Sequence, residues 1–125
     1  MTQSKPRVLI IEDEKSMMDA LHLKLSSEGL DVSSAFDGRE GLELVDREVF
    51  DCILLDLVMP KVDGFVVLGE LQKKKNAPPI IVLTNLSQGE DEQRAKELGA
   101  KAFFVKTDIS INDIVTEVKK VVEKK

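Results

Sequence analysis

The stretch Ile53–Pro60 reads ILLDLVMP, a run of apolar residues interrupted by one carboxylate, Asp56. A short apolar run of this kind is typical of a buried strand in a parallel sheet. An ionised aspartate left alone among apolar side chains costs on the order of several kcal/mol. Asp56 must therefore be neutralised, paired with a cation, or placed where the strand emerges into water.

Apolar runs recur at Val8–Ile11, Cys52–Leu55 and Ile80–Leu83, and each is followed by a longer segment with helical spacing. This alternation predicts βα units and an α/β fold with a parallel sheet. Two further strands are predicted at Leu30–Phe36, which is more mixed, and at Ala102–Val105, which is short. We expect these two strands to lie at the edges of the sheet. In the second of them, Phe103 and Phe104 are expected to lie on opposite faces, one in the core and one at the rim.

Helix signals fall between the predicted strands. Met17, Met18, Leu21 and Leu25 form the apolar stripe of a first helix, which Gly29 ends. Capping residues predict the starts of four more helices. These are Asp37 with Glu40, Asp63 for a helix that runs to Lys75, Ser87 with Glu90, and Ser110 with Asp113.

The predicted order of elements is βαβαβαβαβα. Right-handed crossovers, with the three most apolar strands in the middle, are satisfied by the strand order 2-1-3-4-5 with helices on both faces. This is the flavodoxin-like doubly wound fold. At 125 residues, without an internal repeat or a linker, the chain is expected to form one domain over residues 1–125.

The composition excludes several classes of protein. A net charge of −5 gives nucleic acid no general attraction, so direct nucleic-acid binding is not expected. The N-terminal apolar run is too short for a signal peptide or a membrane span, which indicates a cytoplasmic protein. The single cysteine, Cys52, permits no internal disulfide and is interpreted as a small buried thiol on a strand.

Polar residues follow the predicted central strands at the edge where ligands bind in such sheets, outside the carboxyl ends of the strands. Glu12 and Asp13 follow the first strand, Asp56 the third, Thr84 the fourth and Lys106 the fifth. Singly, each residue is more simply explained as a capping or surface residue. Together they predict a functional site, because unrelated surface residues need not lie at the same edge.

Three carboxylates at one edge repel one another, by roughly 4 kcal/mol for two charges about 4 Å apart at an effective dielectric near 20. They need a proton or a cation, and Mg²⁺ suits carboxylates, water and phosphate oxygens better than softer metals do. With Lys106 as an ammonium and Thr84 as a hydroxyl donor, the group predicts a phosphoryl site. Asp56 is the residue left to attack phosphorus and form an acyl phosphate.

These residues, in this order and spacing, carry a resemblance over the whole chain. Glu12-Asp13, Asp56 in LLDLVMPKVDG, Thr84 and Lys106 make the sequence similar to the bacterial response regulator receiver domains of two-component signalling. The resemblance implies that Asp56 is the phosphoacceptor. It also implies that the receiver catalyses only its own phosphorylation and dephosphorylation and is not otherwise an enzyme.

The resemblance implies a role for each further site residue. Asp13 would be the main Mg²⁺ ligand, Glu12 would act directly or through water, and the Val58 backbone carbonyl would complete the set with Asp56. Thr84 and Lys106 would bind phosphoryl oxygens. Finally, Phe103 matches the switch aromatic of the family, which turns inward when the threonine moves.

The resemblance also implies the partners. A histidine kinase or a phosphotransfer protein would donate the phosphoryl group, and a downstream protein that the sequence does not identify would read the result. The chain would act as a monomer or as a phosphorylation-dependent dimer, without contact with a membrane. The fourth helix, with Ala95 and Leu98 as its only apolar anchors, is expected to be held weakly and to lie on the output face.

The chain departs from the family pattern after the fifth strand, where Lys106 is followed by Thr107 and not by proline. A cis bond before a non-proline residue costs about 2.5–4 kcal/mol, so we expect a trans bond here. Near the site, Asn85, Leu86 and Val58 offer no side chain that obviously orients an attacking water. The expected consequence is slow self-dephosphorylation.

Two other classes of function remain as alternatives. A pseudo-receiver would bind a partner without being phosphorylated, which the complete set of site residues disfavours. A haloacid-dehalogenase-like phosphatase would require a second aspartate two residues after Asp56, where this chain has Val58. A nucleotide hydrolase is not supported, because neither GxxxxGK[ST] nor GxGxxG is present.

Overall fold

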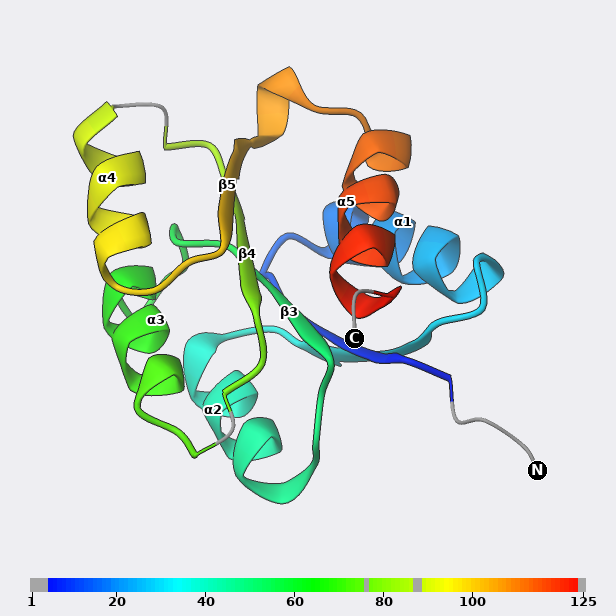
Figure 1. The fold of residues 1–125 in the computed structure, drawn as a ribbon. Coiled ribbons are helices and arrows are strands. Elements are labelled where there is room, and N and C mark those ends of the chain that lie inside the picture. The colour runs from blue at the N-terminus through cyan, green and yellow to red at the C-terminus, as the bar shows by residue number, and fades with distance from the viewer. Residues whose placement is uncertain (1–4, 76, 87–88, 124–125) are drawn as a thin grey trace.

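Five parallel strands form one sheet in the order β2-β1-β3-β4-β5. The computed structural model describes residues 5–75, 77–86 and 89–123. The strands are β1 (Arg7–Ile11), β2 (Asp31–Ala35), β3 (Cys52–Leu55), β4 (Ile80–Thr84) and β5 (Ala102–Val105). The predicted α/β fold, its strand order and the edge positions of β2 and β5 are confirmed (Figure 1).

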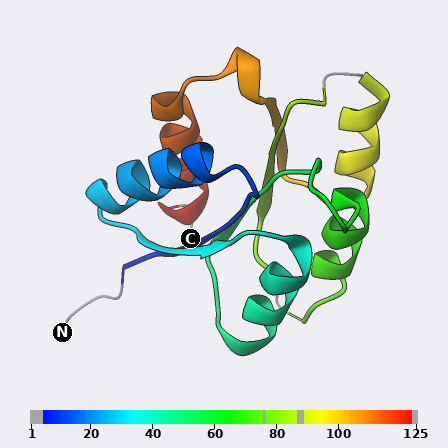
Figure 2. The same cartoon turned by 180° about the vertical axis from the view of Figure 1, so that it is seen from behind.

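Helices cover both faces of the sheet, as Figures 1 and 2 show from opposite sides. Two of them, α1 (Lys15–Ser27) and α5 (Ile111–Glu123), pack on one face. The other face carries α2 (Gly38–Arg47), α3 (Gly64–Gln72) and α4 (Gly89–Glu97). No helix in the part of the chain that the structure describes has the length and apolar character to cross a membrane.

The alternation of side chains along each strand builds two separate apolar cores. On β1, Leu9 and Ile11 face the core under α2, α3 and α4, whereas Val8 and Ile10 face the core under α1 and α5. The residues of β3 and β4 alternate in the same way and are buried throughout. The continuous apolar runs in the sequence are therefore explained by helices on both sides of the central strands.

Helix caps agree with the sequence signals where the structure describes them. The Asp37 carboxylate accepts a hydrogen bond from the Glu40 N–H (2.8 Å), and Asp63 accepts one from the Phe65 N–H (2.8 Å). The Ser110 hydroxyl accepts from the Asp113 N–H (3.1 Å). Gly29 has a φ of +89°, a conformation that suits glycine at the end of α1. The predicted Ser87 cap lies outside the described residues.

Two predicted elements were longer than the structure has them. The third helix ends at Gln72 and not at Lys75, because the next two N–H groups bond to carbonyls three residues back and tighten the turn. The second strand is shorter than Leu30–Phe36 by one residue at each end. Strand β4 ends at Thr84, as predicted, and this residue pairs with Val105.

Arg7 ties together several segments at the amino ends of the strands. Its guanidinium pairs with Glu48 and with Asp31 (3.5 Å), donates to the Val49 carbonyl (3.1 Å), and lies over the Phe50 ring. Its backbone N–H donates to Asp51 (2.8 Å). One side chain thus joins β1, β2 and the connection between α2 and β3.

The single cysteine, Cys52, is fully buried at the start of β3, as the sequence predicted. Burial raises the pKa of its thiol to about 12, with a smaller contribution from the charge of Asp51. A thiol held in its protonated form is a poor nucleophile and a poor metal ligand. Cys52 therefore acts as a small core residue.

We predict that Gly64→Ala lowers the free energy of unfolding by about 2–3 kcal/mol, because a Cβ at this position would overlap the backbone of Leu57. Urea denaturation measures this loss, and the m-value should be the same as that of the native chain. Gly69→Ala is the matched control in α3, since a Cβ there meets only Leu98 at 3.9 Å. The control is expected to gain about 0.5–1 kcal/mol from helix propensity, and equal behaviour of the two variants would contradict the prediction.

Candidate functional site

The predicted site residues lie at the carboxyl edge of the sheet. Glu12 and Asp13 directly follow β1, Asp56 follows β3, and Thr84 is the last residue of β4. Lys106 opens the short 3₁₀ helix η1 (Lys106–Asp108) after β5. Residues that are distant in sequence are thus brought to one edge by the parallel arrangement of the strands.

Ladder hydrogen bonds carry the two central acids one residue beyond their strands. The Asp56 N–H donates to the Ile11 carbonyl (3.0 Å), and the Glu12 N–H donates to the Ala35 carbonyl (3.0 Å). Both side chains are nearly buried, with 2% of Glu12 and 5% of Asp56 exposed. The hydrogen bonds that align the strands therefore also fix the backbone positions of Glu12 and Asp56.

Glu12, Asp13 and Asp56 form a cluster of carboxylates. One ligand oxygen from each residue lies within 4.8 Å of those of the other two, and Asp13 is the exposed member. Oxygen donors in such a group suit a hard divalent cation such as Mg²⁺. The exposed Asp13 gives the cluster access to solvent.

Lys106 supplies the positive charge within this cluster. Its Nζ lies 2.7 Å from Glu12 Oε1 and 3.1 Å from Asp56 Oδ2, and 7% of its side chain is exposed. Burial by itself lowers the pKa of the ammonium, but hydrogen bonding to Glu12 and the charges of Asp56 and Glu12 outweigh it and raise the pKa above 10.5. Lys106 is therefore protonated at neutral pH.

Burial raises the pKa of Glu12 above its ordinary 4.5, against the lowering effect of its hydrogen bonds with Lys106 and with the Glu14 N–H. The folded protein then holds a proton on Glu12 in a pH window just above 4.5 where the unfolded chain has lost it. As pH rises through this window, Glu12 lowers the free energy of unfolding. Removing Lys106 would enlarge this effect.

Thr84 is fully buried beneath the site. Its hydroxyl accepts a hydrogen bond from the Leu86 N–H (3.4 Å), and within the described residues none joins it to the three acids. The side chain of Asn85 is exposed, whereas that of Leu86 is half-buried. Thr84 is therefore at the predicted edge but is not bonded to the carboxylates.

Phe103 and Phe104 lie on opposite faces of β5, as predicted from strand alternation. The expectation that one ring is in the core and the other at the rim was wrong, because both are half-buried. β5 is an edge strand, so helices cover each of its faces only in part. Phe103 packs against the core under α2, α3 and α4.

The loop between β3 and α3 begins at the site. The Val58 N–H donates to Asp56 Oδ1 (3.1 Å), which holds the carboxylate in an Asx turn, while 52% of Val58 is exposed. Further on, the Val62 N–H donates to the Pro60 carbonyl (2.9 Å) across Lys61, whose φ is +75°. This is a γ-turn with positive φ, a strained conformation for a residue with a side chain.

The bond between Lys106 and Thr107 is trans, since the described part of the chain contains no cis peptide. The prediction made from the missing proline is confirmed. After β5 the backbone turns into η1, with Thr107 and Asp108 exposed. Lys106 thus reaches inward from the first residue of a helical turn.

One residue near the site was not predicted from the sequence. Glu14 Oε1 lies 3.8 Å from Lys106 Nζ, and 57% of the Glu14 side chain is exposed. Glu14 also occupies the N-cap of α1 without forming a side-chain cap. A glutamate at a helix start beside two other acids was the available signal, because glutamate is not among the preferred N-cap residues.

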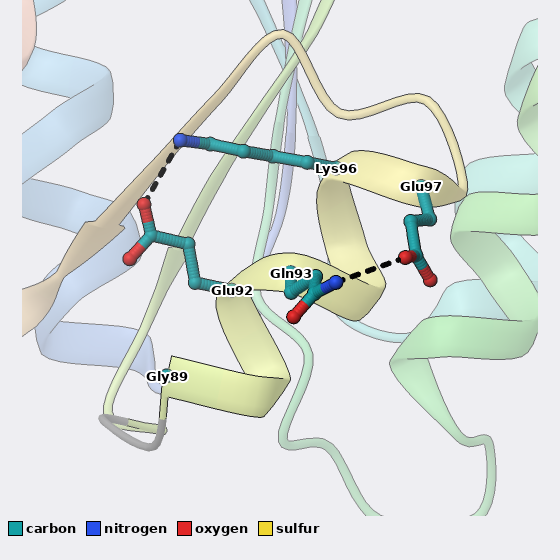
Figure 3. A pocket seen from close by; sticks show the side chains of 5 residues that line it. All are labelled: Gly89, Glu92, Gln93, Lys96 and Glu97. Carbon is teal, nitrogen blue, oxygen red and sulfur yellow. Dashed lines mark hydrogen bonds and ion pairs between the residues drawn. The ribbon is translucent and has the colours of Figure 1, made fainter.

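The outer surface of α4 is charged and shallow. Figure 3 shows ion pairing of Glu92 with Lys96 (2.9 Å) and a hydrogen bond from Gln93 to Glu97 (3.3 Å) around an open hollow of about 520 Å³. Within the described helix, Ala95 alone is buried. The prediction that few apolar anchors hold α4 is confirmed, and the hollow has no buried polar group to bind a ligand.

Comparison with known families decides the class of this domain. The family described as "Response regulator receiver domain" matches residues 8–119. The chain belongs to this family. Its cluster of Glu12, Asp13 and Asp56 is typical of the phosphoacceptor site of receiver domains and is consistent with their metal site.

Individual receiver domains and regulators are similar to the chain. The receiver domain of the Francisella response regulator 1452 has 29% sequence identity and a TM-score of 0.89, covering 96% of this chain and 98% of that one. A CheY-like receiver domain protein from Methanospirillum hungatei JF-1 has 26% identity and a TM-score of 0.90, covering 97% and 96%. The receiver fold is thus matched over nearly the whole chain.

Two curated relatives are described as transcriptional regulators. The probable transcriptional regulator ycf27 of Porphyridium aerugineum is 45% identical over 102 residues, which cover 82% of this chain and 42% of the relative. The transcriptional regulatory protein DltR of Streptococcus agalactiae is 39% identical over 100 residues, covering 80% and 45%. The chain therefore spans less than half the length of these relatives.

We predict that Lys106→Met lowers the free energy of unfolding by about 3 kcal/mol at pH 7.5, because it leaves two nearly buried carboxylates without their cation. The loss should shrink as pH falls toward 4.5, since Glu12 then takes up a proton in the folded state. Urea denaturation at pH 7.5 and at pH 5 measures both effects.

Lys101→Met is the matched control for this variant, because Lys101 is exposed next to the opposite end of β5. It should change stability by less than about 0.5 kcal/mol at either pH. A Lys106 variant with the same loss at both pH values would show that the paired carboxylates are not the cause.

Proposed function

We propose that the protein is a phosphorylation-controlled switch whose phosphoacceptor is Asp56. The observation that supports this most is the ammonium of Lys106 between Glu12 and Asp56, beside the exposed Asp13. A carboxylate can act as a nucleophile toward phosphorus, and a nearby ammonium can bind the phosphoryl oxygens of the donor. We also propose that residues 1–125 form a single receiver domain.

In the proposed reaction, an Asp56 carboxylate oxygen forms a bond to the phosphorus of a phosphohistidine. The phosphorus–nitrogen bond breaks, and its electron pair remains on the imidazole nitrogen, which takes a proton from solvent. Lys106 lies 3.1 Å from Asp56 Oδ2 and is positioned to pair with a phosphoryl oxygen. Thr84 ends the neighbouring strand and would hydrogen-bond a second oxygen.

The donor set fits Mg²⁺, because its side-chain ligands are carboxylate oxygens that lie close together. We propose that Asp13 and Asp56 hold the ion, with Glu12 acting directly or through water and the Val58 carbonyl completing the protein ligands. When bound, Mg²⁺ supplies positive charge against the charge of the transferred phosphoryl group. Lys106 and Thr84 would hydrogen-bond oxygens of that group.

The signal would pass from Thr84 and Phe103 to the surface formed by α4, β5 and α5. Both residues lie in adjacent strands, where Val82 pairs with Phe103 and Thr84 with Val105. The Phe103 ring is half-buried, and we propose that its burial changes with the state of the site. Since α4 is anchored by little apolar burial, a small change in β4 and β5 can shift it.

The proposed partners follow from the family. A histidine kinase or a phosphotransfer protein would donate the phosphoryl group, and the output surface would contact a downstream protein. Because similar regulators are described as transcriptional regulators, a full-length form of this protein could act on transcription. The receiver itself would not contact nucleic acid or membrane and would be a monomer or a phosphorylation-dependent dimer.

A pseudo-receiver that only binds a partner is the alternative. It would need neither Mg²⁺ nor an ionised Asp56, and it would leave the buried pair of Lys106 with the two acids as a structural element. A haloacid-dehalogenase-like phosphatase is less well supported, because the position two residues after Asp56 is Val58. Chemical modification of Asp56 distinguishes these proposals.

We predict that incubation with Mg²⁺ and acetyl phosphate adds one phosphoryl group to the native chain and none to Asp56→Asn. The adduct should require Mg²⁺ and be cleaved by hydroxylamine, as an acyl phosphate is. Intact-mass measurement checks this. Asp51→Asn is the control, because it removes a carboxylate at the other edge of the sheet. This variant should still gain one phosphoryl group on Asp56. An unmodified native chain, with acetyl phosphate and with a panel of histidine kinases, would favour the pseudo-receiver.

We predict slow loss of the phosphoryl group, because Val58, Asn85 and Leu86 offer no side chain placed to orient water. Val58→Asn should then accelerate the loss by about three- to tenfold by adding a polar group at the exposed rim. Decay of the adduct after removal of the donor, followed by mass, measures the rate. Val66→Asn, on α3 and similarly exposed, is the control. A native half-life as short as that of the variant would contradict the prediction.

A further inference from the structure

Glu14 occupies a position that usually stabilises a helix, yet its side chain does not cap α1. It has the extended backbone of an N-cap, and its carbonyl accepts the first helical hydrogen bond, from Met18 (2.9 Å). Serine, threonine, aspartate and asparagine are preferred at such positions because their short side chains reach the free N–H groups. A residue that gives up this local stabilisation often serves a site.

The Glu14 side chain lies at the rim of the phosphoacceptor site. Its Oε1 is 3.8 Å from Lys106 Nζ, while the same ammonium contacts Glu12 at 2.7 Å and Asp56 at 3.1 Å. Glu12 and Asp56 are nearly buried, whereas more than half of the Glu14 side chain is exposed. Of the three carboxylates around Lys106, Glu14 is therefore the one that an approaching molecule meets first.

The carboxylate of Glu14 changes the net charge of the site. Glu12, Asp13 and Asp56 carry three negative charges, and Lys106 offsets one of them. A divalent cation would bring these four residues to neutrality, and Glu14 then leaves the rim with a net negative charge. Its carboxylate also competes with an incoming phosphoryl group for the Lys106 ammonium.

We propose that Glu14 is a specificity-determining residue that strengthens divalent-cation binding and disfavours small, freely diffusing phosphoanion donors. This inference rests on the proposed function of Asp56. A free donor such as acetyl phosphate brings its own negative charge to the rim and has little surface with which to offset the repulsion. A phosphohistidine on a protein is brought in by docking contacts, so the rim carboxylate selects for protein donors.

The reaction with acetyl phosphate gives a direct measure of this effect. An Asp56 oxygen forms a bond to phosphorus, the bond from phosphorus to the acetyl oxygen breaks, and acetate leaves with the electron pair. Glu14 takes no part in these bonds. Its influence is electrostatic and acts on the approach of the donor and on the availability of Lys106.

Three variants of Glu14 separate charge from helix capping. Glu14→Gln removes the charge and keeps the size of the side chain, and Glu14→Asp keeps the charge. Glu14→Ser removes the charge and introduces a preferred cap, so its thermal midpoint should rise. Asp19→Asn is the matched control, because Asp19 is similarly exposed on α1 and pairs with Lys15 away from the site. The three Glu14 variants and Asp19→Asn all keep the backbone N–H of residue 14, which donates to Glu12.

The first measurement is Mg²⁺ affinity by isothermal titration calorimetry, without any donor. We expect Glu14→Gln and Glu14→Ser to weaken Mg²⁺ binding by about two- to fivefold at low ionic strength. Glu14→Asp and Asp19→Asn should stay close to the native value. The difference should shrink in high salt, as expected for an exposed charge.

The second measurement is the rate of phosphorylation at saturating Mg²⁺. Glu14→Gln and Glu14→Ser should be phosphorylated by acetyl phosphate about two- to fivefold faster than the native chain. The gain should be smaller with phosphoramidate, which carries less negative charge, and smaller in high salt. Opposite changes in cation affinity and in donor rate are the signature of a rim charge, which a purely structural role does not produce.

Several results would overturn the inference. One such result is a Glu14→Gln variant whose Mg²⁺ affinity and rate of phosphorylation by acetyl phosphate equal those of the native chain. Another is an Asp19→Asn variant that changes both quantities as much as Glu14→Gln does. If Glu14→Ser differed from Glu14→Gln in the direction of its effect on donor rate, capping and not charge would be responsible. A native chain that is never phosphorylated at Asp56 would overturn the proposed function itself, and the donor selectivity with it.

Discussion

The structure depends on one buried ammonium. Lys106 follows β5, yet its Nζ contacts acids that follow β1 and β3, so the ion pairs pass over the end of the intervening β4. Glu12 and Asp56 are nearly inaccessible to solvent, and burying charged groups there without a cation would cost free energy. The question posed by the lone carboxylate in ILLDLVMP is thus answered by a residue fifty positions later.

This arrangement links folding and chemistry. The ladder hydrogen bonds that align β1 with β3 also bring Glu12 beside Asp56, so an error of register would separate them. The same ammonium that offsets the charge of the buried acids lies against the carboxylate that we propose as the phosphoacceptor. In the proposed reaction, a cation or a phosphoryl group that enters the site would rearrange these ion pairs.

Much of the fold and the chemical groups of the site could be predicted from the sequence. Apolar runs are strong signals because both faces of the central strands are covered, and polar residues after each strand identify the functional edge. The contacts within the site are different, since they depend on side-chain directions. That Lys106 bridges two acids, that Glu14 joins it and that Thr84 bonds to Leu86 could not be read from spacing.

Other errors also have local physical causes. The third helix tightens before Lys75 because three successive lysines after Gln72 bury little and allow bonds to carbonyls three residues back. Phe103 and Phe104 are both half-buried because β5 has a neighbour on one side only. The end of a helix and the burial of a side chain depend on where the neighbouring elements end. The residue pattern within one segment does not contain this information.

The contacts of Arg7 bear on how the two ends of the sheet are held together. They fasten two strands and a connecting loop at the edge of the sheet opposite the acids, through charge, hydrogen bonds and an aromatic ring. The amino edge of the sheet is therefore cross-linked by one arginine, whereas the carboxyl edge is cross-linked by one lysine, Lys106. The two ends of the sheet are thus joined through separate cations, so the loss of one would leave the contacts of the other in place.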